Sequence, residues 1–189
     1  MNAYAEAVRN DDITSTRVSD ETLILEEALH YVDAGEEEGA QWKRIRSSLN
    51  QPVEKFKRKV VGSEAAEYWG KATATIHASP ELVLSYIWFI DSNENLKYRE
   101  SSGLLLHRVE YLPDSRTQLV DIGKVFPTVS NRLFSSRNAW GRVEDESGSR
   151  FVIAYQQRDL DEAEFNKIQE EFGTLVKGTA RQVIIIEKV

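Results

Sequence analysis

Residues 69–90 read WGKATATIHASPELVLSYIWFI and join two patterns of different period. Residues 69–78 alternate, with glycine and alanine facing one way and larger side chains the other, which predicts a strand. Ser79 then has the residue type of a helix cap and Pro80 that of a first helical position, and residues 81–90 are almost entirely apolar. A helix that is apolar around most of its circumference is buried on several sides or lines a cavity.

The remaining segments predict a helix near the N-terminus, a meander of short antiparallel strands and one late helix. The helix signals are a polar cap followed by apolar residues at helical spacing, and the strand signal is alternation between short turns. The expected helices are 19–35 and 161–172, the expected strands are 55–61, 104–112, 117–125, 133–143, 150–156 and 179–189, and residues 41–49 form either a short helix or an irregular packed segment.

The composition is that of an ordinary globular domain, because 41 % of the 189 residues are hydrophobic and 29 % are charged. Cysteine is absent, which excludes disulfides, zinc–cysteine sites and thiol nucleophiles. No stretch approaches the roughly 18 apolar residues of a membrane span, and residues 1–12 lack the apolar core of a signal peptide. We therefore expect a cytoplasmic, soluble protein with a disordered or loosely attached acidic tail at 1–18 and one domain at 19–189.

The net charge of −7 argues against broad nucleic-acid binding, which needs a strongly positive face. One basic segment, 43–59, stands out. Such a run is usually a solvated face, and the alternative is a patch for anionic lipid headgroups. In that alternative, the residues in transient contact with a membrane surface are Lys43, Arg44, Lys55, Lys57, Arg58 and Lys59.

Catalytic and metal-binding patterns are scarce. His30, His77 and His107 lie far apart, without the short spacings of metal ligands, and no phosphate-binding glycine loop or nucleophile elbow is present. We therefore predict no metal, no cofactor and no catalytic residue. Under the alternative of an enzyme, Tyr111, His107 or Tyr155 could serve as an acid or a base.

Two charged residues occupy strand faces that are otherwise apolar. Asp121 shares its expected face with Leu119 and Val125, and Arg137 shares its own with Leu133. If both faces are interior, the two charges pair with each other or solvate a polar ligand group, because an isolated buried charge costs several kcal/mol. If the register slips by one residue, both face solvent. The residues alone leave both alternatives open.

The order of these segments resembles the START family, the lipid-transfer domains related to the steroidogenic acute regulatory protein. The resemblance covers about residues 42–189. It implies a START-like helix-grip fold of the α+β class, in which a curved antiparallel sheet wraps around the apolar helix, and it implies an interior acid and arginine at Asp121 and Arg137. The residues that carry it are WGKATATI at 69–76, ASPELVLSYI at 78–87, the hairpin that follows, and SNRLF at 130–134 with Arg137 and Trp140 after it.

The resemblance also implies a function, which is the non-enzymatic binding of a lipid or sterol in an apolar cavity, for transfer or for sensing. It implies further that the domain lacks the family's final strands and C-terminal helix, so that the edge of strand 179–189 is open to self-association. The alternatives are an interaction or regulatory module with a vestigial cavity, or a small helix-grip enzyme acting on a hydrophobic substrate. The expected ligand-binding residues are Asp121, Arg137, Tyr86, Trp88, Ile90, Leu106, Leu119, Trp140, Ile153 and Phe165.

Overall fold

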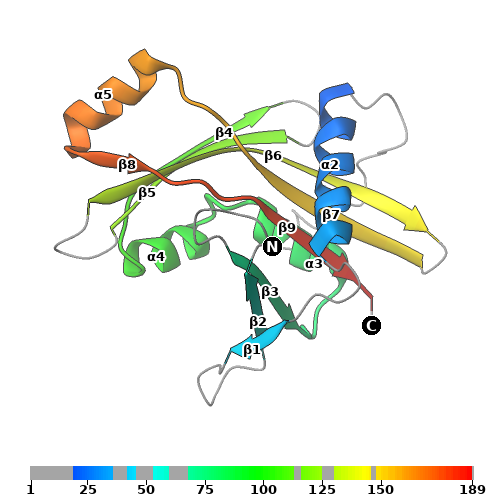
Figure 1. The fold of residues 1–189 in the computed structure, drawn as a ribbon. Coiled ribbons are helices and arrows are strands. Elements are labelled where there is room, and N and C mark those ends of the chain that lie inside the picture. The colour runs from blue at the N-terminus through cyan, green and yellow to red at the C-terminus, as the bar shows by residue number, and fades with distance from the viewer. Residues whose placement is uncertain are drawn as a thin grey trace.

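The computed structural model describes seven parts of the chain. Within them, four helices and nine strands form one larger sheet, one smaller sheet and helical layers on both faces of the larger sheet (Figure 1). No helix in these parts has both the length and the apolar content needed to cross a membrane. The predicted tail at 1–18 lies outside the described residues, which are 19–35, 42–45, 53–59, 68–112, 116–124, 130–145 and 148–188.

The larger sheet has six strands and is curved (Figure 1). Five of them follow the order β4-β5-β6-β7-β9 with antiparallel neighbours, and the short β8 runs parallel to the first residues of β6. The predicted meander is confirmed, since the strands are β4 (Leu104–Leu112), β5 (Arg116–Gly123), β6 (Asn131–Asp145), β7 (Gly148–Gln157), β8 (Leu175–Lys177) and β9 (Gln182–Glu187).

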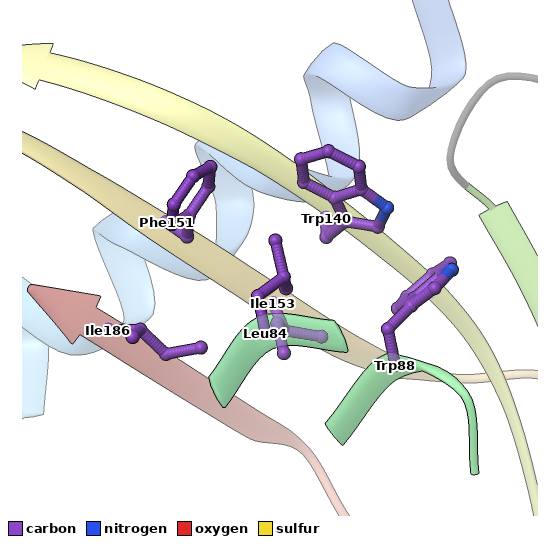
Figure 2. Close-up of a cluster of buried hydrophobic side chains, with 6 residues drawn as sticks. All are labelled: Leu84, Trp88, Trp140, Phe151, Ile153 and Ile186. Atoms are coloured by element: carbon purple, nitrogen blue, oxygen red, sulfur yellow. The ribbon is translucent and has the colours of Figure 1, made fainter. Parts of the chain in front are cut away.

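Helix α3 (Pro80–Trp88) packs against one face of this sheet, as its apolar sequence predicts. Its start is fixed by Ser79, whose Oγ accepts a hydrogen bond from the backbone N–H of Leu82 at 3.3 Å. Leu84 and Trp88 point from α3 towards the sheet (Figure 2). The buried cluster that they complete is Leu84, Trp88, Trp140, Phe151, Ile153 and Ile186.

Helices α2 (Ser19–Gly35) and α5 (Glu162–Phe172) cover the opposite face of the same sheet. Helix α2 buries one apolar stripe against β6, β7 and β9, and its members are Ile24, Leu25 and Ala28. Helix α5 begins at the cap Asp161 and ends at Gly173, whose φ of 76° is one that glycine adopts readily. Because helices cover both faces, the predicted fold class is confirmed: a curved antiparallel sheet packs around an apolar helix, with an N-terminal helix and a helix inserted between late strands.

The smaller sheet differs from the prediction, because its three strands do not join the larger sheet. Its order is β1-β2-β3, and all neighbours are antiparallel. The prediction of a short helix or irregular segment at 41–49 is wrong where the chain is described, since part of it is a strand. A three-residue strand is too short to show a period. The bounds are β1 (Lys43–Ile45), β2 (Val53–Lys59) and β3 (Tyr68–Ala74).

Helix α4 (Asn93–Ser101) was not expected from the sequence, NENLKYRES. It carries no apolar stripe, and its residues are exposed or half-buried as far as their burial is described. It is attached at its start by Asn95, whose Nδ2 donates to the carbonyl oxygens of Tyr86 and Phe89. Sequence patterns identify helices by an apolar face, so a helix without one gives no signal.

Candidate functional site: a buried charged cluster on the α3 side of the sheet

A charged cluster forms where β4, β5 and α4 meet. His107 and Asp121 are direct partners in the register of β4 and β5, and His107 Nδ1 lies 2.6 Å from Asp121 Oδ1. Arg99 of α4 reaches the other carboxylate oxygen, with 3.1 Å between its Nη1 and Asp121 Oδ2. Three separate elements therefore converge on one carboxylate.

The cluster faces the same way as the aromatic core beneath α3. Alternation along β6 places Phe134 on the same side of the sheet as Trp140, and the register sets Phe134 opposite Asp121. Because Trp140 packs with α3, Asp121 and its partner His107 also lie on the α3 side. The prediction that Asp121 is an interior acid is therefore consistent with its position.

The short contact fixes where the protons lie. At 2.6 Å from a carboxylate oxygen, Nδ1 of His107 must donate a hydrogen bond to Asp121. The 3.5 Å approach of Arg99 Nη1 to the same Nδ1 joins two donors and is not a hydrogen bond. In the neutral imidazole, the proton on Nδ1 leaves Nε2 as a hydrogen-bond acceptor.

The cluster is largely shielded from solvent. The exposed fractions of the side chains are 8 % for His107, 16 % for Asp121 and 26 % for Arg99. Nε2 of His107 is buried and has no hydrogen-bond partner among the residues that the structure describes. Buried polar atoms almost always have a partner, so this acceptor is a place for water or for a polar group of a ligand.

A second polar group lies on the same side of the sheet, in the row formed by Thr117, Asn138 and Tyr155. Nδ2 of Asn138 donates to Oγ1 of Thr117 at 3.0 Å, and both residues are only 1 % exposed. Oδ1 of Asn138 is buried without a partner, so it is a second unused acceptor. Burial raises the pKa of Tyr155 to about 12, and Arg99 and Asp121 also act on this phenol, which places it within electrostatic range of the cluster.

The segment that connects α3 to α4 contacts β4, the outer strand of the sheet that also carries His107. The hydroxyl of Tyr111 on β4 donates to the carboxylate of Asp91. The rings of Tyr111 and Phe89 have their centroids 6.1 Å apart. These contacts and the pair of Arg99 with Asp121 hold α4 over this half of the sheet.

The structure divides the predicted ligand-binding residues between the two faces of the sheet. On the α3 side, together with Asp121, are Trp88, Leu119, Trp140 and Ile153, and Ile90 is buried just beyond α3. Leu106 and Phe165 belong instead to the cluster beneath α5 on the opposite face. Tyr86 lies on α3 with 42 % of its surface exposed.

Arg137 does not share an interior with Asp121, so neither alternative left open by the residues holds for both: Asp121 is interior and Arg137 is exposed. The interior arginine that the resemblance implies at Arg137 is therefore wrong. The register sets Arg137 opposite Gln118, one position out of phase with Asp121, and its side chain is exposed on the face that α2 and α5 cover. The physical reason is that both faces of the sheet are apolar, so the pattern of β6 fits either orientation. The arginine that pairs with Asp121 is Arg99. It was missed because α4 has no sequence signal, whereas alternation along β4 could have placed His107 beside Asp121.

The pockets of the described residues are small. One lies between α2 and the sheet, with a volume of about 30 Å³, and another lies near Arg158 and Gly178, with about 10 Å³. Neither borders Tyr86 or Trp88, and Trp88 packs edge to face on Trp140 with 6.5 Å between ring centroids. At this contact the aromatic core beneath α3 is packed. No group of three or more metal-ligating side chains occurs among the residues that the structure describes.

Comparison with known proteins finds similar solved structures. No protein-family model matches the chain, and no curated protein does. Among solved structures, the chain is similar to the human StarD13 (DLC2) lipid transfer and protein localization domain. The two have 16 % sequence identity and a TM-score of 0.47, over 73 % of this chain and 67 % of the other. This similarity concerns the fold alone.

Proposed function

We propose that this protein binds a lipid or sterol without catalysis, between the larger sheet and the α3–α4 segment, for transfer or for sensing. The observation that carries the proposal is the buried Nε2 of His107, which has no partner among the described residues and lies beside the Arg99–Asp121 ion pair, on the face of the sheet that also carries the aromatic core beneath α3. An amphipathic molecule matches this combination, because its polar end would satisfy the acceptor and its apolar part would lie against the core.

The cluster favours a polar end that donates a hydrogen bond. The charges of Arg99 and Asp121 cancel, and the two unused atoms, His107 Nε2 and Asn138 Oδ1, are both acceptors. A hydroxyl group, as in a sterol or an acylglycerol, fits them better than a phosphate, which offers further acceptors. Removing the apolar part of the ligand from water supplies most of the affinity, at roughly 25 cal/mol per Å² before ordering costs.

Binding requires the packed core to open, and α4 is the element best suited to move. It contributes no side chain to the buried clusters, and a few polar contacts attach it to the rest of the chain. Displacing α4 separates Arg99 from Asp121 and gives access to the cluster. A region with few buried apolar contacts opens at low free-energy cost.

The test is native mass spectrometry of protein expressed in a lipid-rich host. We expect a co-purified lipid or sterol, and we expect its occupancy to fall in His107→Leu, which removes the acceptor. His77→Leu is the matched control, because His77 is exposed and outside the cluster. Wild-type protein that is empty and stays empty when sterols or acylglycerols are added would refute the proposal. Equal occupancy in both variants would refute the assignment of the polar end to His107.

Two alternatives predict different outcomes in the same experiment. The orientation of His107 by Asp121 is also the geometry of a general base, and a chemically altered ligand in the recovered complex would favour an enzyme. An empty, self-associating chain would favour an interaction module with a vestigial cavity.

We propose two further contacts for the protein. One is transient contact of the basic segment 43–59 with a membrane surface, since exchange of a lipid needs a membrane. The other is self-association through β9, which pairs with β7 and has no second neighbouring strand among the described residues. Sedimentation velocity over a range of concentrations tests the latter, because a monomer at every concentration would contradict it.

A further inference from the structure

The smaller sheet has two chemically different faces, which alternation along its strands separates. The register sets Lys43 of β1 directly opposite Lys57 of β2, and Lys55 and Lys59 lie two positions to either side of Lys57, on the same face. Arg44 and Arg58, which the sequence groups with these lysines, lie on the other face.

The arginine face of the smaller sheet is occupied by contacts within the protein. The guanidinium group of Arg58 lies over the rings of Trp42 and Trp69, at 5.5 and 5.2 Å from their centroids. Trp69 in turn stacks on Tyr31 of α2 with 4.1 Å between ring centroids, and Arg44 Nη2 forms an ion pair with Glu54 at 2.8 Å. This face is therefore turned towards α2, and its arginines already have partners within the protein.

The opposite face, here called the lysine face, carries basic, aromatic and aliphatic groups together and no acidic residue at its described positions. Tyr68 is 59 % exposed and Ile45 is 40 % exposed. The strand β3 contributes small residues to this face and also Tyr68, whose ring centroid lies 5.6 Å from Lys57 Nζ. The lysine face consists of Lys43, Lys55, Lys57, Lys59, Ile45, Val53, Tyr68, Gly70, Ala72 and Ala74.

Like charges on this face work against the stability of the sheet. Directly opposed pairs of the same charge, such as Lys43 and Lys57, are destabilising in a free sheet, and lysines two positions apart on β2 are only about 7 Å apart along the strand. An anionic surface relieves this repulsion. Exposed tyrosine and isoleucine among lysines also match the interface of a bilayer, where amphipathic rings and lysine stems are favoured.

We infer that the lysine face is a docking surface for an anionic membrane. The smaller sheet projects from the body of the protein, so the larger sheet does not cover it (Figure 1). The net charge of −7 disfavours long polyanions that would contact the rest of the surface, whereas a membrane touches this projecting face alone. The inference rests on the membrane contact proposed above and assigns it to one face of the smaller sheet. It does not depend on the ligand, so an empty cavity with intact vesicle binding would refute only the ligand proposal.

The test is flotation of the whole chain with phosphatidylcholine vesicles of which about one-third is phosphatidylserine, compared with phosphatidylcholine alone. We expect binding to the anionic vesicles that weakens as salt is added. The combined variant Lys43→Glu, Lys57→Glu and Lys59→Glu should lose at least about 100-fold in apparent affinity, because loss of each lysine charge near the surface costs about fivefold and the new carboxylates add repulsion.

The matched control is Lys97→Glu, Lys124→Glu and Lys167→Glu, which changes the net charge equally at exposed lysines elsewhere. It should retain most of the binding. Equal losses of vesicle binding in the two triple variants would overturn the inference. Wild-type binding that does not increase with phosphatidylserine, or a preference for single-stranded RNA over the vesicles, would also overturn it. Glutamine at the same three lysine-face positions provides a milder variant, and thermal unfolding of each variant confirms that it is folded.

Discussion

Asp121 accepts a hydrogen bond from His107 across the β4–β5 pair at 2.6 Å, and the same carboxylate receives Arg99 from α4 at 3.1 Å. One side chain thus links two strands of the larger sheet to the helix that lies over them. The carboxylate orients the ring of His107 so that Nε2 points away from the pair. It also anchors α4 through Arg99, so the stability of this part of the fold depends on Asp121.

Replacing Asp121 with asparagine should destabilise the protein by about 2 kcal/mol, because Arg99 loses its partner in a mostly buried setting. The midpoint of urea unfolding measures this change. Asp159→Asn, at an exposed position, is the control and should have little effect. Equal midpoints for the two variants would mean that the cluster contributes no net stability.

Stability should fall as the pH rises from 10 to 12, because of Tyr155. Its pKa is about 12 in the folded protein and 10.0 in the unfolded chain, so in this window the unfolded chain releases the phenolic proton and the folded protein keeps it. The unfolded state is favoured by about 2 to 3 kcal/mol once both forms have titrated. Below pH 10 this effect is absent. The comparison of wild type with Tyr155→Phe isolates it, and parallel stability curves for the two would contradict the prediction.

Leu84→Ala should cost about 3 kcal/mol of unfolding free energy, because Leu84 is fully buried at the centre of the α3 cluster and its truncation leaves a cavity. Tyr86→Ala, on the exposed side of the same helix, should change the free energy by only about 0.5 kcal/mol. Chemical denaturation of both variants checks the orientation of α3. A larger loss for the tyrosine variant would show that α3 is rotated.

Asp161→Ala should cost about 1 kcal/mol, since the Asp161 carboxylate accepts the backbone N–H of Glu164 at 2.7 Å and caps α5. Asp161→Ser keeps a capping oxygen and should recover most of the loss. Thermal unfolding of the wild type and the two variants measures this change. A serine variant with a melting temperature as low as that of the alanine variant would argue against capping.

The sequence predicts those elements whose signals are local. Ser79 with Pro80 marks the start of α3, Asp161 and Gly173 mark the two ends of α5, and alternation gives the bounds of β4 correctly. Each signal depends on side chains within a few residues of the boundary, so one strand or one helix turn contains the information.

The candidate site depends on relationships between distant segments, which the sequence does not contain. Whether Asp121 and Arg137 share a face is decided by the register of β5 on β6, and a sheet that is covered on both faces has no polar side to fix that choice. Arg99 enters the cluster from α4, a polar helix without periodicity. The lysine face could not be predicted from the sequence either, because neighbouring basic residues point to opposite sides of a strand.

The four tryptophans are divided equally between the smaller sheet and the core beneath α3. Trp42 and Trp69 flank Arg58 in the smaller sheet, whereas Trp88 and Trp140 meet in the core beneath α3. Intrinsic fluorescence therefore carries two separable signals, and replacing one pair with phenylalanine leaves an optical reporter for the other half of the molecule. Emission from the first pair follows events at the projecting sheet, and emission from the second follows the opening of the aromatic interior.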